Sequence, residues 1–249
     1  MASKIRTMEL LLLSSSRTPA GYFTEYLPAI KHFTSSARRA VFIPYAAVGL
    51  PWPDYQKRVT EATGIAFSEE LSEADLIVVG GGNTFQLLRE CRARKLLERI
   101  AERVRTGKAR YLGWSAGANL ACPTIKTTND MPIVDPAALD ALGLLRFQIN
   151  PHYLNVSLPG HHGETRNDRL AEFARVNPDL PVIGLPEGDW LRVSGPRIEV
   201  HGAHHAVWFH GEKVPEDVRP IASYEAGTWR GAASSNAGYE EKPLDRTPR

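Results

Sequence analysis

Short, uniformly apolar runs recur along the first three quarters of the chain. Strands that are apolar throughout, rather than alternating, are typical of a sheet that is covered on both faces. Amphipathic stretches separate these runs, and alternation of strand and helix favours parallel pairing with helices on both faces. The pattern therefore predicts an α/β fold with a doubly wound, mostly parallel sheet. The expected strands are 9–14, 40–45, 75–79, 109–114 and 181–186, and the expected helices are 21–33, 53–63, 84–105 and 165–176.

One connection in this scheme is short. A possible strand at 64–68 lies only a few residues before the strand that opens at Asp75. A parallel crossover usually needs a dozen or more residues. We therefore expect 64–68 either to lie outside the main sheet or to pair antiparallel at its edge.

The chain changes character towards its C-terminus. Segments 190–194, 197–201 and 206–210 are shorter and more alternating, which predicts a small antiparallel extension. From about Gly227 the sequence is small, polar and charged, with little to bury. We expect one domain over 1–226 and a disordered tail over 227–249, since 249 residues suit a single α/β domain.

Composition narrows the class of protein. Hydrophobic residues make up 43% and charged residues 23%, as in globular proteins, and a net charge of +2 without a basic block argues against a nucleic-acid partner. Only Cys91 and Cys122 are present, so a disulfide framework is not expected. The apolar run 10–13 is too short for a membrane span or a signal peptide. We expect a cytoplasmic protein without membrane contact, as a monomer or homodimer.

The clearest chemical motif is G-x-S-x-G at residues 113–117, directly after a predicted strand. This context is that of a nucleophile elbow, in which Ser115 would project from the sheet edge. A helix that begins behind Ser115 would also direct backbone N–H groups at an oxyanion. The same pentapeptide is equally compatible with an ordinary strand-to-helix turn that has a capping serine.

A second glycine-rich segment, residues 80–84, ends another predicted strand. Three glycines allow the backbone to approach a ligand closely. In a serine hydrolase such a loop donates one oxyanion hydrogen bond and the residue after the serine donates the other, which points to Gly82 and Ala116. A nucleotide-phosphate loop is less favoured because no G-x-G-x-x-G or Walker pattern is present.

A serine nucleophile needs a base and an acid that orients it. His152 ends the predicted strand 147–151, at the sheet edge where ligands of open parallel sheets bind. Glu187 follows the strand at 182–186 and is the favoured acid, with Asp130 in the loop 127–133 as its competitor. Either acid is also compatible with an ordinary solvated loop residue.

Five motifs in the same order closely resemble peptidase E, the α-aspartyl dipeptidases. The resemblance runs from about Met8 to Gly211, and its central motif is long and specific. The motifs are GGGNTFQLL (80–88), GWSAGANLACPTIKTTNDMPIVDP (113–136), INPHY (149–153), GETR (163–166) and GLPEG (184–188).

The resemblance implies hydrolysis of dipeptides with an N-terminal aspartate, on a fold like the class I glutamine amidotransferases (flavodoxin-like). Matched by motif, the resemblance implies that Ser115, His152 and Glu187 form the triad and that Asp130 is a substrate-site or supporting residue. We also expect Asn83 in the substrate site. The order of the triad along the chain differs from that of the α/β-hydrolases, where histidine comes last. The implied chemistry requires no metal or organic cofactor.

Arg166 matches the arginine that recognises the substrate's aspartate side chain in that family. A guanidinium binds a carboxylate bidentately and stays charged, and one charge-assisted hydrogen bond contributes roughly 1.5–3 kcal/mol. Without the resemblance, Arg166 would be interpreted as a solvated residue opening a helix. The glycine-containing segment 155–164 is expected to be a mobile loop that orders over substrate. Its His161 and His162 lack an adequate set of metal ligands around them.

The chain departs from the family pattern by seven residues before Met8, a shortened segment between Thr63 and Asp75, and the polar tail. Two other functions stay open: a hydrolase of aspartate-rich polymers resembling cyanophycinase, and a catalytically silent binding protein. A glutamine amidotransferase is not favoured, because the elbow holds Ser115 and Cys122 is interpreted as a core residue.

Overall fold

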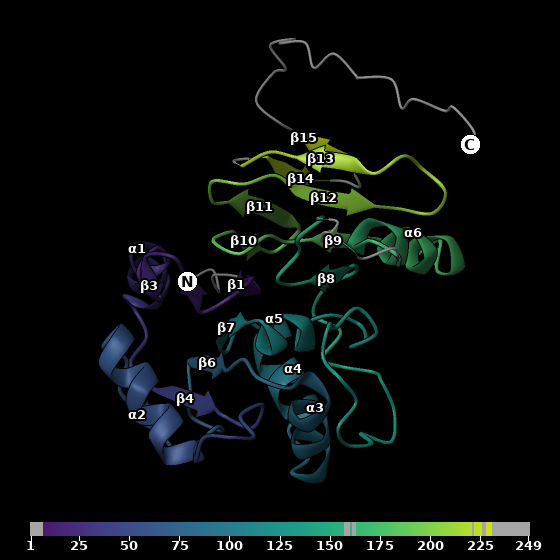
Figure 1. The fold of residues 1–249 in the computed structure, drawn as a ribbon. Coiled ribbons are helices and arrows are strands. Elements are labelled where there is room, and N and C mark those ends of the chain that lie inside the picture. Colours follow the sequence, from purple (N-terminus) through teal and green to yellow (C-terminus); the bar gives the residue numbers. More distant parts are fainter. Residues whose placement is uncertain (1–6, 157–159, 161–162, 221, 226–227, 231–249) are drawn as a thin grey trace, which may run out of the picture.

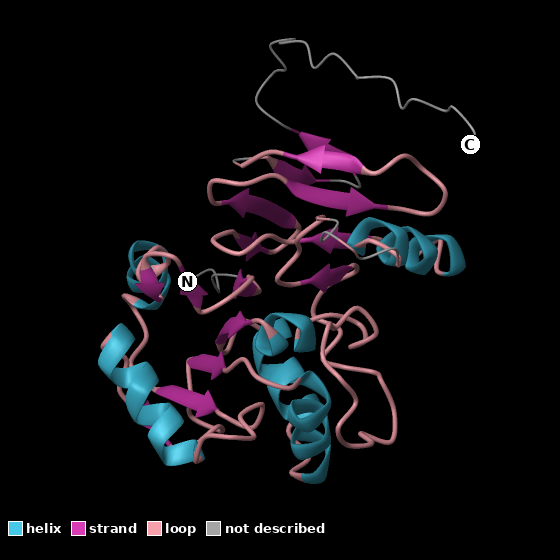
Figure 2. Ribbon diagram, in the orientation of Figure 1, coloured by secondary structure: helices cyan, strands magenta, loops and turns pink. Residues whose placement is uncertain are grey.

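The part of the chain that the structure describes forms two large β-sheets with helices packed around them, shown in Figures 1 and 2. The computed structural model describes residues 7–156, 160, 163–220, 222–225 and 228–230. The main sheet has nine strands in the order β15-β14-β11-β10-β1-β7-β6-β4-β5. The second sheet has four strands in the order β13-β12-β9-β8, and β2 and β3 form a separate hairpin.

One half of the main sheet is parallel and arises from the apolar runs of the sequence. Its strands pair in parallel along their whole register, and those of four or more residues are almost entirely buried. This confirms the α/β, mostly parallel fold expected from uniformly apolar segments. The strands are β1 (Glu9–Leu13), β4 (Ala40–Ile43), β5 (Phe67–Ser68), β6 (Leu76–Val79) and β7 (Arg110–Trp114).

Helices cover both faces of this parallel half (Figure 1). Alternate residues of a strand point to opposite faces, so Leu11 and Leu13 pack with α1 and α2 whereas Leu10 and Leu12 pack with α3, α4 and α5. The helices are α1 (Leu27–Thr34), α2 (Trp52–Thr63), α3 (Thr84–Ala93), α4 (Leu97–Arg105) and α5 (Ala116–Leu120).

Two of the predicted helices have different bounds. The segment expected as one helix over 84–105 forms α3 and α4, with a break at Lys95, whose φ is +53°. The helix expected over 21–33 begins at Leu27, because β3 (Gly21–Tyr22) pairs with β2 (Arg17–Thr18). In both places local pairing and turns interrupt a continuous amphipathic pattern.

Strand β5 pairs parallel with β4 at the edge of the main sheet, so both expectations for segment 64–68 were wrong. The short connection is possible because β5 has only two residues, and Phe67 and Leu76 lie level with Ala40 on its two sides. The connection therefore crosses from one side of β4 to the other with almost no return along the strand direction before β6 begins.

The C-terminal strands form a larger antiparallel part than expected. Strands β10, β11, β14 and β15 continue the main sheet beyond β1, and β12 and β13 join the second sheet. The bounds are β10 (Trp190–Ser194), β11 (Arg197–His201), β12 (Ala206–Phe209), β13 (Glu216–Val218), β14 (Ser223–Glu225) and β15 (Thr228–Arg230).

The expected strand at 181–186 belongs to the second sheet rather than the main one. Strand β9 (Val182–Gly184) pairs parallel with β8 (Gln148–Asn150) and antiparallel with β12. Helix α6 (Arg166–Val176) packs on this sheet through Leu170 and Ala174. The two sheets meet near the carboxyl ends of β1, β7, β8 and β9.

Strand β15 falls inside the segment 227–249 that was expected to be a tail, so the sheet extends past that boundary. The rest of that segment, 231–249, lies outside the described residues, as do 157–159 and 161–162 of the predicted loop. None of the helices in the described part of the chain combines the length and apolar character that a membrane-spanning helix needs.

Candidate active site

Ser115 occupies a tight turn between β7 and α5. Its φ of 52° and ψ of −114° are costly for a residue with a side chain, by about 1–3 kcal/mol, and such strain clusters at functional sites. The flanking glycines are required, since a Cβ on Gly113 would lie 2.5 Å from the carbonyl oxygen of Gly117. A Cβ on Gly117 would lie 2.2 Å from the carbonyl oxygen of Val79. The turn has the strained strand-to-helix geometry that a nucleophile elbow requires.

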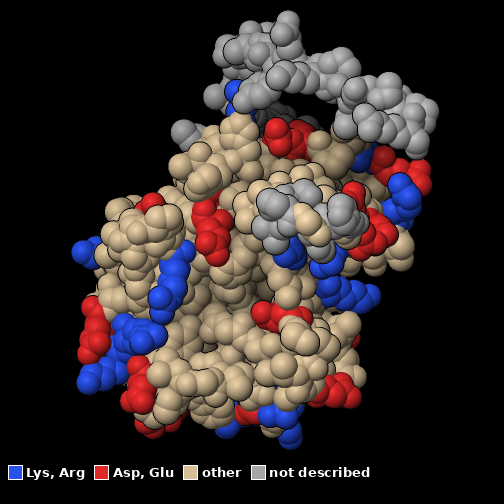
Figure 3. All heavy atoms as spheres, viewed as in Figure 1, with Lys and Arg blue, Asp and Glu red and all other residues tan. Residues whose placement is uncertain are grey.

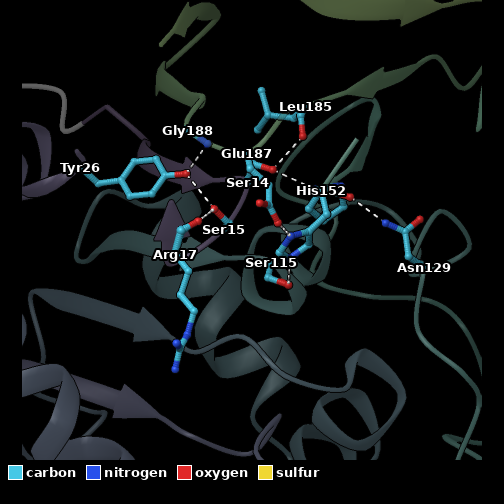
Figure 4. A network of polar contacts seen from close by, with 11 residues as sticks. Ser14, Ser15, Arg17, Tyr26, Ser115, Asn129, His152, Leu185, Glu187 and Gly188 are labelled. Carbon is cyan, nitrogen blue, oxygen red and sulfur yellow. Dashed lines mark hydrogen bonds and ion pairs between the residues drawn. The ribbon is translucent and has the colours of Figure 1, made fainter. Parts of the chain in front are cut away.

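The side chains of Ser115, His152 and Glu187 lie in line (Figure 4). The Nε2 atom of His152 is 2.8 Å from Ser115 Oγ, and its Nδ1 atom is 2.5 Å from Glu187 Oε1. A carboxylate at Nδ1 holds the ring proton there, which leaves Nε2 as an acceptor for the serine hydroxyl. A hydroxyl, an imidazole and a carboxylate therefore lie in the order that the triad of a serine hydrolase requires.

These three side chains come from two sheets. Ser115 follows β7 of the main sheet, whereas His152 and Glu187 follow β8 and β9 of the second. Because β8 and β9 run parallel, their carboxyl ends point the same way and bring both loops towards the elbow. The site is open to solvent, with 39% of the His152 side chain and 54% of the Glu187 side chain exposed.

The glycine loop between β6 and α3 lies against the elbow. A Cβ on Gly81 would come within 3.0 Å of the Ser115 Cβ, and one on Gly82 would lie 2.2 Å from the Ala46 carbonyl oxygen. Within the described part of the chain, the N–H groups of Gly82 and Ala116 donate to no protein acceptor. Both N–H groups remain available as donors beside Ser115.

Asn83 and Asp130 bind the start of α3 rather than the histidine. Asn83 Oδ1 accepts from the Gln86 N–H at 3.0 Å, and Asp130 Oδ2 accepts from the Thr84 N–H at 2.7 Å and its hydroxyl at 2.6 Å. No interaction among the described residues joins Asp130 to His152. Of the two candidate acids, Glu187 is the one placed against the imidazole.

Arg166 lies at the first position of α6. Thr165 caps this helix in a capping box with Asp168, which fixes the orientation of the first turn. The guanidinium donates to Asn129 Oδ1, and Asn129 Nδ2 in turn donates to the Pro151 carbonyl oxygen at 2.7 Å. Burial, and then the neighbouring Arg169, lower the pKa of Arg166, but the guanidinium stays charged at neutral pH.

Charged side chains surround a hollow on the face shown in Figure 3, with basic residues gathered near α6. Among the described residues, no group of three His, Cys, Asp or Glu side chains is arranged to hold a metal ion. Both cysteines are buried, and burial raises the thiol pKa of Cys91 and of Cys122 to about 12. Neither thiol is poised for chemistry.

Sequence reasoning missed the residues directly after β1. Ser14 and Ser15 are buried and bond to the loops that carry His152 and Glu187, in part through Tyr26. The signal in the sequence was a run of three serines, 14–16, following an apolar strand at the edge that carries the site.

A family model, peptidase family S51, matches residues 10–201. The chain belongs to peptidase family S51. The S51 match confirms the resemblance drawn from the motifs, and it makes the chain a serine peptidase.

Curated relatives agree with the S51 assignment. Peptidase E of Salmonella arizonae is 51% identical over 214 residues, covering 81% of this chain and 93% of the relative. Peptidase E of Salmonella typhimurium is 50% identical over the same length and coverage.

Solved structures support the S51 fold. A putative peptidase E protein from Listeria monocytogenes has a TM-score of 0.58 at 23% identity, covering 80% of this chain and 100% of that one. A peptidase from an acI-B1 Actinobacterium has a TM-score of 0.59 at 15% identity, covering 89% and 98%. At these identities the likeness concerns the fold alone.

Proposed function

We propose that this S51 peptidase hydrolyses dipeptides that begin with aspartate, through an acyl-enzyme on Ser115. The observation that carries the proposal is the line of contacts from Ser115 Oγ to His152 Nε2 and from His152 Nδ1 to Glu187 Oε1. A serine hydroxyl is a weak nucleophile until a base within hydrogen-bond reach removes its proton. The proposal is supported because His152 Nε2 lies within this reach of Ser115 and a carboxylate contacts its other ring nitrogen.

Acylation follows from this geometry. Ser115 Oγ attacks the peptide carbonyl carbon while His152 Nε2 takes its proton, and Glu187 stabilises the resulting imidazolium. The N–H groups of Gly82 and Ala116 stabilise the oxyanion, and each such donor contributes roughly 100- to 1,000-fold in turnover. The intermediate collapses as His152 gives its proton to the leaving amine, which releases the second residue of the dipeptide.

Deacylation reverses the roles. Water attacks the aspartyl ester while His152 accepts a proton from it, and the same two donors stabilise the second oxyanion. Collapse of that intermediate breaks the ester bond, and His152 returns the proton to Ser115 Oγ. Free aspartate leaves and the enzyme returns to its starting state.

Recognition of aspartate is assigned to Arg166. Its guanidinium is linked through Asn129 to the carbonyl of Pro151, the residue before the proposed base, so a carboxylate held there lies beside the reacting centre. Asn83 and Asp130 shape the wall of the substrate site, which they border through the start of α3 and the loop at Met131. The preference for Asp over Asn arises because a neutral amide cannot form the charge-assisted pair.

The test is a panel of Asp-X, Asn-X, Glu-X and β-aspartyl dipeptides, with an aspartate-rich polymer as a further substrate. We expect Asp-X cleavage by the wild type and none by Ser115→Ala, with an unchanged thermal unfolding curve. Near-wild-type turnover by that variant would show that Ser115 is not the nucleophile. Cleavage of the polymer alone would support the cyanophycinase-like alternative, and the absence of both cleavage and Ser115 labelling by a serine-directed reagent would support a silent binding protein.

Arg166→Ala tests the specificity. Loss of one charge-assisted hydrogen bond, worth about 1.5–3 kcal/mol, reduces the preference for Asp over Asn by about 10- to 150-fold in kcat/KM. The matched control is Arg169→Ala, which removes a guanidinium from the next turn of α6 that pairs with Glu164 at 3.7 Å. An Asp preference that survives Arg166→Ala, or falls equally in Arg169→Ala, contradicts the assignment.

A further inference from the structure

Three consecutive residues at the carboxyl end of β1 contact all three segments of the proposed triad. The Leu13 carbonyl oxygen accepts from the Ser115 N–H at 3.1 Å. Ser14 Oγ accepts from the His152 N–H at 2.8 Å. Ser15 reaches the segment of Glu187 through the hydroxyl of Tyr26 (Figure 4).

The hydroxyl of Ser14 forms hydrogen bonds with two loops of the second sheet, one after β8 and one after β9. It is fully buried, and besides accepting from His152 it donates to the Leu185 carbonyl oxygen at 2.7 Å. His152 has a φ of +53°, an unfavourable conformation for a residue with a side chain. The bond from Ser14 to its backbone therefore holds the imidazole in a direction that the local chain would not choose unaided.

The bonds around Tyr26 have a definite direction. Ser15 Oγ has a single proton, which it donates to the Arg17 carbonyl oxygen at 2.7 Å, so the Tyr26 hydroxyl must donate to Ser15 at 2.9 Å. The Gly188 N–H then donates to the Tyr26 oxygen at 2.8 Å. Burial raises the pKa of Tyr26, which keeps this hydroxyl protonated and the relay intact at neutral pH.

Gly188 connects this relay directly to the proposed acid. It follows Glu187 in the chain and has a φ of +90°, and a Cβ there would lie 3.2 Å from His204 Cε1. The backbone at 188 is therefore held between Tyr26 and His204. Its position sets where the adjacent Glu187 carboxylate can lie.

We propose that Ser14 and Ser15 are positioning residues of the S51 reaction. Ser14 sets the His152 imidazole against Ser115, and Ser15 acts through Tyr26 to set Glu187 against the imidazole. The proposal rests on the proposed triad. Its physical basis is that the nucleophile belongs to one sheet and its activating groups to the other, so the end of β1 is a bridge on which their mutual distance depends.

The required precision gives the size of the effect. Reacting groups must be held within roughly 0.5 Å of the productive geometry, and a displacement of about 1 Å can cost 100-fold. Loss of one hydroxyl that fixes a backbone segment permits part of such a displacement. We expect Ser14→Ala and Tyr26→Phe each to lower kcat by about 5- to 100-fold while KM changes less than about two-fold.

A merely structural role predicts a different pattern. The control is Ser194→Ala, which removes a hydroxyl that bonds Glu9 at 2.6 Å at the opposite end of β1. It should cost similar stability and leave kcat unchanged. Ser14→Thr keeps the hydroxyl and should restore kcat relative to Ser14→Ala. Equal kcat in Ser14→Ala and Ser194→Ala, after matching for the shift in Tm, would overturn the role of Ser14.

The relay through Tyr26 is tested by a double-mutant cycle. If Tyr26 acts by placing Glu187, then Tyr26→Phe should lower kcat strongly in the wild type but less than about two-fold in a Glu187→Gln background. Tyr26→Phe removes one oxygen atom and keeps the ring, so the buried packing is preserved. An equal loss in both backgrounds would refute the relay.

Rates of Ser115 labelling by a small organophosphorus reagent separate this proposal from the choice of substrate. Labelling reports activation of the serine whichever peptide the enzyme cleaves. Slower labelling in Ser14→Ala and Tyr26→Phe supports positioning even if Asp-X dipeptides are not substrates. Wild-type labelling rates in both variants would overturn the proposal while Asp-X cleavage still stood.

Discussion

Replacement of Glu187 by Gln is the sharpest probe of the electrostatics of the site. The variant keeps the size and the acceptor oxygen of the side chain but removes the charge that faces the His152 imidazolium in the transition state. The two groups are in contact, with 2.5 Å between Glu187 Oε1 and His152 Nδ1. Unit charges about 4 Å apart interact by about 1 kcal/mol in water and about 4 kcal/mol at an effective dielectric constant of 20.

Because the Glu187 side chain is exposed to solvent, we expect the loss of interaction energy with His152 to lie in the lower part of that range. More than half of the Glu187 side chain, 54%, faces solvent, which screens the pair. We therefore expect a loss of about 1–3 kcal/mol of transition-state stabilisation, or about 5- to 150-fold in kcat. This is smaller than the roughly 10,000-fold loss found when a buried triad aspartate is replaced by asparagine.

The assay is steady-state hydrolysis of an Asp-X dipeptide, with kcat and KM determined separately at two salt concentrations. We expect a fall in kcat with little change in KM, and a smaller ratio at high salt because the lost interaction is partly screened. The comparison is Asp130→Asn, which alters a carboxylate that caps α3 and does not touch His152. Full kcat in Glu187→Gln together with a collapse in Asp130→Asn would refute the reasoning.

Three further changes test other parts of the molecule. Gly82→Ala puts a Cβ 2.2 Å from the Ala46 carbonyl oxygen, so the loop must move; kcat should fall by about 100-fold or more, and an unchanged kcat would exclude Gly82 as an oxyanion donor. Burial raises the pKa of Asp189 above its ordinary value of 3.8. The folded state therefore binds this proton more tightly than the unfolded state does, and the free energy of unfolding falls as the pH rises from 3.8 through the pKa of the folded state. In Asp189→Asn this contribution is lost, so the urea midpoint should fall less than in the wild type as the pH rises from 4. Wild-type and variant plots of urea midpoint against pH that run parallel would contradict this. Thr165→Ala removes the cap of α6; it should cost about 1 kcal/mol in urea unfolding and raise KM for Asp-X, and no change in either would show that the cap is dispensable.

Local patterns in the sequence were sufficient for the inner strands of the parallel half, but not for the parallel pairing of β5 at its edge. A run such as residues 10–13, apolar at every position, has no exposed face and is typical of an inner strand covered on both sides. The break between α3 and α4 had no such signal, because Lys95 adopts a positive φ without glycine or proline. The conformation of that turn is therefore determined by tertiary packing rather than by local propensity.

The division into two sheets depended on contacts between distant segments. Strand β9 pairs with β12, which comes later in the chain and carries no local sign of that choice. Reasoning from strand ends still placed His152 and Glu187 near Ser115, because β8 and β9 are parallel and end on the same side. Ser14 and Ser15 were missed because a run of three serines, 14–16, looks like the end of a strand and the start of an ordinary loop.

The placement of Ser115 on one sheet and of its proposed base and acid on the other has a consequence for biosynthesis. A ribosome makes the amino end first, so Ser115 exists well before the residues of β8 and β9 have been added. In the proposed mechanism, a nascent or truncated chain that lacks His152 and Glu187 carries a serine without its base. Hydrolysis would then begin only once the second sheet has docked, and activity would report completed folding.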